Sequence, residues 1–149
     1  MTPAGHDHGG IAGAIFGELY MWTRKHRLGK LYAAETGFVI GRAPDTLRAP
    51  DVAFVAAERV PASGAGFFEG HPDLAVEVVS PGDRESDIDE KVQMWLDAGT
   101  QEVWVAWPRT RSMTVHRPGA EVVLLHGGDT LEAGPVLPGF TLAVSQVFE

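Results

Sequence analysis

The hydrophobic residues of the N-terminal part recur with the spacing of an amphipathic helix. The repeat runs through residues 11–27 and consists of Ile11, Ile15, Leu19 and Trp22. The four basic residues from Arg24 to Arg27 suit the negative end of a helix dipole, and Gly29 can end the helix. Residues 1–10 are rich in Gly and His, which predicts a flexible lead-in to a single domain over residues 11–149.

Short runs of β-branched and aromatic residues, bounded by Gly and Pro, predict strands in the rest of the chain. Residues 31–40 indicate one or two strands around a turn at Thr36 and Gly37. Further strands are expected over residues 51–55, 73–80, 102–107, 112–117 and 120–125. Residues 73–80 are apolar almost throughout, which is typical of a central strand that is covered on both faces.

A second helical repeat separates two of these strands. It covers residues 86–99, where Ser86 fits the N-cap and Gly99 fits the C-terminal end. A strand, a helix and a strand in this order imply a right-handed parallel crossover between residues 73 and 107. The remaining strands follow one another closely, which predicts a C-terminal antiparallel meander. The predicted fold class is therefore α/β or α+β, with one mixed sheet flanked by helices.

Composition narrows the class of protein. The 149 residues are 44% hydrophobic and 21% charged, which is enough to bury a core. The absence of Cys excludes disulfide frameworks, zinc–thiolate sites and cysteine nucleophiles, and it suits a cytoplasmic protein. Gly13 interrupts the first apolar run, so we expect neither a signal peptide nor a membrane span. The net charge of -8 argues against a protein that coats nucleic acid by charge alone.

Glu77 is the most informative polar residue, because it lies in the predicted central strand. An unpaired carboxylate there would cost roughly several kcal/mol. A buried acid indicates either a structural pair with a base or a bound metal ion, and the strand alone leaves both open. Lys91 is the candidate base. It shares a helical face with Ile88 and Trp95, so we expect it on the buried side.

Asp51 begins the neighbouring predicted strand, at an end where side chains can meet a cleft. Asp51 and Glu77 could supply oxygen ligands to Mg²⁺ or Mn²⁺, while Lys91 orients or deprotonates a water. These residue types are what a metal-dependent phosphodiesterase requires. Asp73 and Glu35 are weaker candidates. Asp73 lies about 13 Å from Glu77 along the strand, and both are more simply interpreted as turn acids.

Other chemistry-bearing side chains have simpler structural interpretations. His6 and His8 have the spacing of metal ligands, but in a Gly-rich terminus we expect them to be disordered. Trp95, Trp104 and Trp107 lie within periodic elements, so we expect them in the core rather than in a platform for base stacking. Two basic groups could contact nucleic acid or simply face solvent. They are Arg24, Lys25, Arg27 and Lys30, and Arg109, Arg111 and Arg117.

Several blocks of the chain, in order, resemble one bacterial family. The blocks are AETGFVI (34–40), RAPDVAFV (48–55), PDLAVEVVSP (72–81), AGTQEVWVAWP (98–108) and LPGFTLAVSQVF (137–148). Together they resemble the Uma2 family of restriction-type endonucleases, which is assigned to the PD-(D/E)XK nuclease superfamily. The resemblance implies a restriction-endonuclease-like core, a divalent-metal site and DNA as substrate.

The resemblance also suggests roles for individual residues. The superfamily Asp falls on Asp51 and the acid of the E-x-K element on Glu77, whereas Val79 occupies the Lys position. Lys91 of the following helix would replace that lysine. Trp107 stands where the family has an Asp. Family members often carry an N-terminal hairpin that we do not find here, so an acid from that hairpin would be missing and metal affinity reduced.

Three hypotheses follow. The leading one is an endonuclease that uses Mg²⁺ or Mn²⁺ to hydrolyse DNA phosphodiester bonds, acting as a homodimer by analogy with the superfamily. The alternative is a catalytically degenerate nuclease fold that serves as a binding or assembly module. In the third, Glu77 and Lys91 form a structural ion pair in a plain α+β domain.

Overall fold

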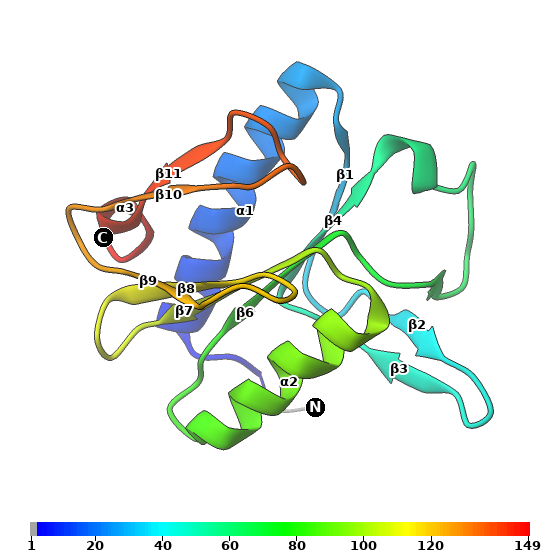
Figure 1. The fold of residues 1–149 in the computed structure, drawn as a ribbon, viewed down its shortest axis with the longest axis horizontal. Helices are drawn as coiled ribbons and strands as arrows, with labels where there is room; N and C mark the ends of the chain where they lie inside the picture. The colour runs from blue at the N-terminus through cyan, green and yellow to red at the C-terminus, as the bar shows by residue number, and fades with distance from the viewer. Residues whose placement is uncertain (1–2) are drawn as a thin grey trace.

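The computed structural model describes residues 3–149, and a six-stranded sheet forms its centre (Figure 1). The strands, in spatial order, are β1 (Gly29–Tyr32), β4 (Val52–Ala56), β6 (Leu74–Val78), β7 (Glu102–Trp107), β8 (Ser112–His116) and β9 (Val123–Leu125). β6 and β7 run parallel and are joined by α2 (Glu85–Ala98), whereas the other neighbours are antiparallel. The predicted mixed sheet and parallel crossover are therefore confirmed.

The two faces of the sheet carry different helices (Figure 1). Strand alternation directs Val76 of β6 toward α1 (His6–His26), where it joins a core that includes Ile15. It directs Ala75 toward α2, where it packs in a second core with Trp95. Glu77 is two residues beyond Ala75 and so faces α2.

Both long helices begin earlier than the sequence pattern predicts. α1 begins at His6, so residues 6–10 are helical and the prediction of a flexible lead-in is wrong for them. Contact with the sheet explains the difference, because Ile11 and then His8 continue the buried face toward the N-terminus. α2 begins at Glu85 with Arg84 rather than Ser86 as its N-cap. The predicted end at Gly99 is confirmed, with a positive φ of 113°.

Two small sheets lie outside the predicted single sheet. One consists of β3 (Thr46–Arg48), β2 (Phe38–Gly41) and β5 (Phe68–Glu69). The short 3-10 helix η1 (Ala57–Arg59) follows β4 and contacts β1. The other pairs β10 (Thr130–Glu132) with β11 (Thr141–Ala143) and leads to α3 (Val144–Val147). The meander prediction is thus confirmed for β7 to β9, but the chain then leaves the main sheet and packs on its α1 side.

The buried carboxylate of Glu102 attaches the segment that follows β10 to the main sheet. The carboxylate of Glu102 accepts hydrogen bonds from the Trp104 indole at 2.8 Å, from Arg117 at 3.0 Å and from the backbone N–H of Gly134 at 3.1 Å. These donors satisfy the buried charge, so Glu102 is a structural residue. Trp104 and Trp95 are fully buried, which confirms their predicted core placement. Trp107 is partly buried and packs against the α2-side core, so its placement is confirmed in part.

Within residues 3–149, no helix is both long enough and apolar enough to cross a membrane.

Candidate functional site

Asp51 immediately precedes β4, and Glu77 lies on the neighbouring strand β6. The β4–β6 register pairs Val52 with Val76, and the backbone N–H of Asp51 donates to the carbonyl oxygen of Val76 at 3.1 Å. Asp51 is thus held beside the residue that precedes Glu77. The backbone N–H of Val78 donates to Oδ2 of Asp51 at 2.7 Å, which fixes this carboxylate against β6. The structure therefore brings the two predicted acids together.

Glu77 is a buried carboxyl group whose protonation is strongly affected by its surroundings. Its side chain lies in the α2-side core, and the residue is only 6% exposed. The Trp95 indole N–H donates to its Oε2 at 2.9 Å. Burial raises the pKa of Glu77 to about 7; the Trp95 hydrogen bond and the Lys91 charge lower it, while the charges of Asp51 and Asp83 raise it further. At neutral pH this carboxyl group is therefore close to half protonated.

His8 is a site residue that the sequence interpretation missed. Its Nε2 lies 3.4 Å from Oδ2 of Asp51, and the two side chains are only 16% and 22% exposed. The expectation that His8 is disordered is wrong, because the first turn of α1 packs beside the end of β4. The helical phase contained the signal, since His8 is three residues before the buried Ile11 and so lies on the same face.

Lys91 has an exposed side chain, so the prediction of burial is wrong. Ile88, Val92 and Trp95 fill the face of α2 that meets the sheet. Lys91 lies at the edge of that face, where a long aliphatic stem can keep its ammonium group in water. Glu77 and Lys91 form no ion pair among the described residues, and Glu77 bonds to an indole N–H instead. The Lys91 charge nevertheless lowers the pKa of Glu77.

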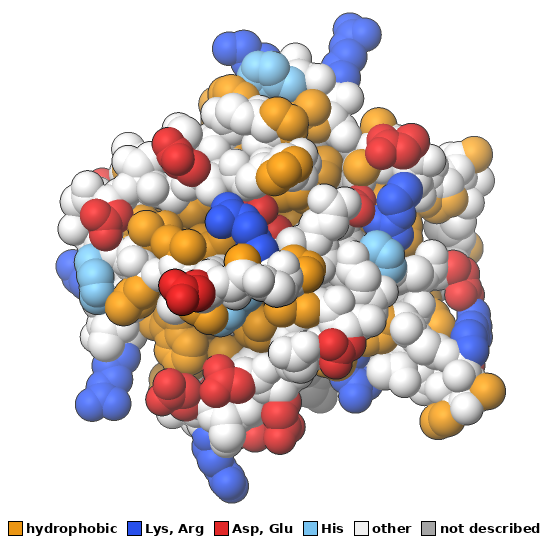
Figure 2. Space-filling model, in the orientation of Figure 1, with side chains coloured by type: hydrophobic (Ala, Val, Ile, Leu, Met, Phe, Trp, Pro, Cys, Tyr) orange, Lys and Arg blue, Asp and Glu red, His pale blue; other side chains and the backbone are white. Residues whose placement is uncertain are grey.

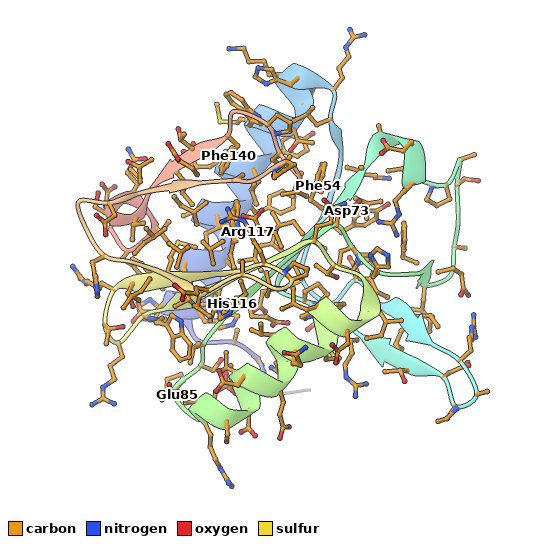
Figure 3. The ribbon with its side chains drawn as sticks, in the orientation of Figure 1. Phe54, Asp73, Glu85, His116, Arg117 and Phe140 are labelled. Carbon is orange, nitrogen blue, oxygen red and sulfur yellow. The ribbon has the colours of Figure 1, made fainter. Side chains whose placement is uncertain are left out.

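The two weaker candidates have different positions. Asp73 lies at the opposite end of β6, where it accepts the Ala56 backbone N–H at 2.7 Å and pairs with Arg59 at 2.9 Å. Figure 3 shows Asp73 well separated from Glu85, the first residue of α2. Asp73 is therefore a structural acid. Glu35 is exposed in the β1–β2 turn but lines the same cavity as Asp51.

Two cavities adjoin the start of α1. The first, of about 900 Å³, is lined by Asp51, Glu35 and small residues of α1 and the β1–β2 turn, which confirms that Asp51 meets a cleft. The second, of about 680 Å³, is lined by Asp83, Trp107 and Arg109. Asp7, His8, Ser80 and Pro81 line both cavities. His8 is thus open to solvent on two sides and Asp51 on one, whereas the buried Glu77 lines neither cavity.

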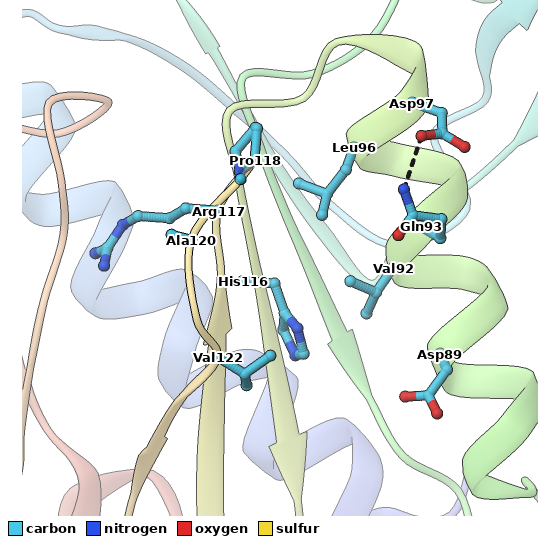
Figure 4. A pocket seen from close by; sticks show the side chains of 11 residues that line it. Asp89, Val92, Gln93, Leu96, Asp97, His116, Arg117, Pro118, Ala120 and Val122 are labelled. Carbon is cyan, nitrogen blue, oxygen red and sulfur yellow. Dashed lines mark hydrogen bonds between the residues drawn. The ribbon is translucent and has the colours of Figure 1, made fainter.

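A third cavity, of about 530 Å³, lies between α2 and the segment that follows β8 (Figure 4). Its lining includes His116, whose pKa is lowered by burial, together with Asp89 and Gln93 of α2. The His116 ring lies 2.9 Å from the hydroxyl group of Thr114. None of the predicted site residues lines this cavity, so we do not assign it to the site.

The pair of carboxylates fits a hard divalent cation. In residues 3–149, no hydrogen bond engages Oδ1 of Asp51 or Oε1 of Glu77, so each acid keeps an oxygen for a ligand. No three or more His, Cys, Asp or Glu side chains of these residues are grouped so as to hold a metal ion. Mg²⁺ commonly takes only one or two protein carboxylates and completes its shell with water and substrate phosphate. Asp51 and Glu77 meet that requirement.

Comparisons with known proteins agree with the fold. The search of curated proteins finds no match. A crystal structure described as "a putative nuclease belonging to DUF820 from Anabaena variabilis ATCC 29413" is similar, with a TM-score of 0.85 and 20% sequence identity. The alignment covers 99% of this chain and 83% of that chain, and at this identity the likeness shows the fold. Residues 1–145 match the sequence profile of the Uma2 family, described as "Putative restriction endonuclease". The chain therefore belongs to the Uma2 family, as its sequence blocks predicted.

Proposed function

We propose that the protein is an endonuclease that uses Mg²⁺ or Mn²⁺ to hydrolyse phosphodiester bonds in DNA. The observation that carries this proposal is the buried Glu77 carboxyl group near Asp51, with its pKa raised to about 7. Two carboxylates held so close repel each other when both are charged, and a divalent cation between them removes that repulsion. Membership of the Uma2 family supports the same reaction class.

In this proposal the two acids have supporting groups that fix their orientation. The Val78 N–H holds one oxygen of Asp51, and the Trp95 N–H holds one oxygen of Glu77. The remaining oxygens, Oδ1 and Oε1, would hold the cation. When bound, the cation would polarise the scissile phosphate and lower the pKa of a bound water.

Lys91 would act on the substrate from the edge of α2. Its exposed ammonium group sits on a flexible stem, and its charge already acts on Glu77. From this edge it would orient the attacking water and offset the negative charge that develops on the phosphate. Lys91 thus has the role expected for the lysine missing at Val79.

Cleavage of plasmid and oligonucleotide DNA with Mn²⁺ tests the proposal. We expect cutting by the natural protein and its loss in Glu77→Gln and Asp51→Asn, which keep the shape of each side chain but remove its charge. Glu90→Gln is the matched control, because Glu90 is exposed on α2. Equal cutting by Glu77→Gln would refute the assignment and indicate a contaminating nuclease.

A catalytically degenerate binding module is the second candidate. Two observations favour it: Trp107 occupies the position of a family acid, and His8 already contacts Oδ2 of Asp51. Calorimetric titration of the folded protein with Mn²⁺ separates the two candidates. Heat of binding that disappears in Glu77→Gln supports the enzyme, and no binding supports the module.

We propose, by analogy with superfamily nucleases that pair to cut two strands, that the protein acts as a homodimer. β9 is an edge strand of the six-stranded sheet, and Figure 2 shows hydrophobic side chains gathered around β8 and β9. Val122, Val123 and Leu124 are 55%, 40% and 56% exposed. An exposed apolar edge favours strand pairing with another chain. Light scattering should show a dimer that Leu124→Lys dissociates.

A further inference from the structure

Trp107 lies on the same face of the sheet as Glu77 and close to it. The β6–β7 register pairs Glu77 with Val105, and Trp107 is two residues further along β7. Adjacent strands are separated by about 4.8 Å and each residue rises about 3.3 Å, so the two Cα atoms are about 8 Å apart. Trp107 therefore stands at the rim of the candidate site, beyond the buried acid.

The Trp107 ring is both accessible and held in place. It is partly buried and lines the cavity of about 680 Å³ that His8 shares with the Asp51 cavity. Its indole N–H donates to the hydroxyl group of Thr114 at 2.9 Å, which anchors the polar edge to β8. One part of the ring packs against the α2-side core, and the rest of its apolar surface faces the cavity.

Arg109 supplies the cationic group of this cavity. It follows β7 in the turn to β8, and its side chain is exposed. Arg109 forms no ion pair within residues 3–149, although Asp7, Asp83 and Glu85 line the same cavity. An unpaired guanidinium group beside an aromatic ring is the donor arrangement that binds a phosphate next to a stacked base.

We propose that this cavity binds one unpaired nucleotide of the substrate strand, next to the phosphate that is cut. The base stacks on Trp107, and Arg109 binds the adjoining phosphate. This inference rests on the proposed function, because it takes DNA as the ligand, and it adds that single-stranded or unpaired DNA is the preferred substrate class.

The size and chemistry of the cavity support an unpaired nucleotide over a duplex. A volume of about 680 Å³ is that of a small-molecule pocket. In a duplex the base faces are covered by their neighbours, so a base reaches Trp107 only when it is unstacked or already single-stranded. Among residues 3–149, Arg109 is the one Lys or Arg in the lining of this cavity, so the cavity offers a cationic contact to a single phosphate.

Fluorescence binding measurements test the site without any cleavage. A labelled 12-nucleotide single strand and the same sequence as a duplex are titrated into the full-length protein in Ca²⁺. We expect the single strand to bind about 10-fold more tightly, and Trp107→Leu and Arg109→Gln each to weaken it about 10-fold. Trp107→Phe keeps an aromatic face and should retain most of the affinity. Arg111→Gln is the matched control, because Arg111 is exposed in the same turn but does not line the cavity.

Intrinsic fluorescence gives a second readout of stacking. Trp95 and Trp104 are fully buried, and Trp22 is partly buried but does not line the cavity. Quenching by the single strand should therefore come from Trp107 and be absent in Trp107→Phe but retained in Trp22→Phe. Equal affinity for both DNA forms, or unchanged binding by Trp107→Leu with its fold verified by circular dichroism, would overturn the inference. Cleavage with Mn²⁺ is measured alongside. Binding without cleavage refutes the proposed function alone, whereas duplex cleavage that is indifferent to Trp107 and Arg109 refutes the inference alone.

Discussion

The indole N–H of Trp95 donates a 2.9 Å hydrogen bond to Oε2 of Glu77, and this bond connects α2 to the centre of the sheet. Both residues are buried, so the bond is shielded from water. It satisfies one oxygen of a carboxyl group that burial would otherwise leave without a partner. It also orients that group so that its other oxygen can serve a ligand.

Metal-free protein should lose stability as the pH rises, because of Glu77. Its pKa is about 7 in the folded protein and 4.5 in the unfolded chain, so the folded state binds more protons between these values. Stability therefore falls from pH 4.5 to pH 7 and stays lower above it, by about 3 kcal/mol in total. Glu77→Gln should remove this penalty. Urea unfolding in a chelator should show the variant more stable than the natural protein at pH 8 but not at pH 4.5. An identical pH slope in both proteins would contradict the assignment.

Bound Mn²⁺ should offset the loss of stability that the charged Glu77 carboxylate causes at high pH. A cation that binds only the folded protein raises Tm with its concentration. We expect thermal unfolding at pH 8 to shift upward with Mn²⁺ in the natural protein and not in Asp51→Asn or Glu77→Gln. Ca²⁺ and Na⁺ at matched ionic strength control for general screening. A shift of the same size in both variants would show that the metal binds elsewhere.

Replacing Trp95 by Phe should weaken metal binding in a pH-dependent way. The substitution keeps an aromatic ring but removes the N–H that lowers the pKa of Glu77. The pKa of Glu77 then rises further, and protons compete more strongly with the cation. Calorimetry should show a larger loss of Mn²⁺ affinity at pH 6.5 than at pH 8.5. A uniform loss at both pH values would indicate a packing defect instead.

Lys91→Met should separate activity from stability. Lys91 is exposed, so the free energy of unfolding should change by less than about 0.5 kcal/mol. DNA cleavage should fall about 100-fold if the ammonium group offsets charge in the transition state. Gln93→Met, at another exposed position of α2, should leave cleavage unchanged. Cleavage that persists in Lys91→Met would remove Lys91 from the proposed site.

Breaking the Asp73–Arg59 pair should lower stability without changing metal binding. Arg59→Met leaves the buried Asp73 carboxylate with the Ala56 N–H but without its counter-charge. We expect a loss of about 2 kcal/mol in the free energy of unfolding, because Arg59 is itself partly exposed. Mn²⁺ affinity of the folded fraction should not change. A drop in affinity without a drop in stability would return Asp73 to the list of candidate ligands.

Local patterns in the sequence were sufficient to predict the main helices and strands and the burial of Glu77. Alternation in β6 places Glu77 inside an apolar strand because side chains of a strand alternate between faces. The β6–α2–β7 crossover follows from the chirality of strand connections. Both rules depend on residues close in sequence, and both predictions agree with the structure.

The composition of the site was decided only by tertiary structure. Asp51 lies beside the β6 residues that flank Glu77 because β4 pairs with β6, and this pairing depends on packing between segments far apart in sequence. Packing of α1 on the sheet brings His8 to Asp51, and the rotation of α2 leaves Lys91 at the edge of its buried face. The helical repeat predicts which residues of α2 share a face. How many residues beside that face are buried depends on the surface of the sheet against which the helix packs. The sequence by itself thus determined which residue types the site contains, whereas the contacts between distant elements determined which of them meet.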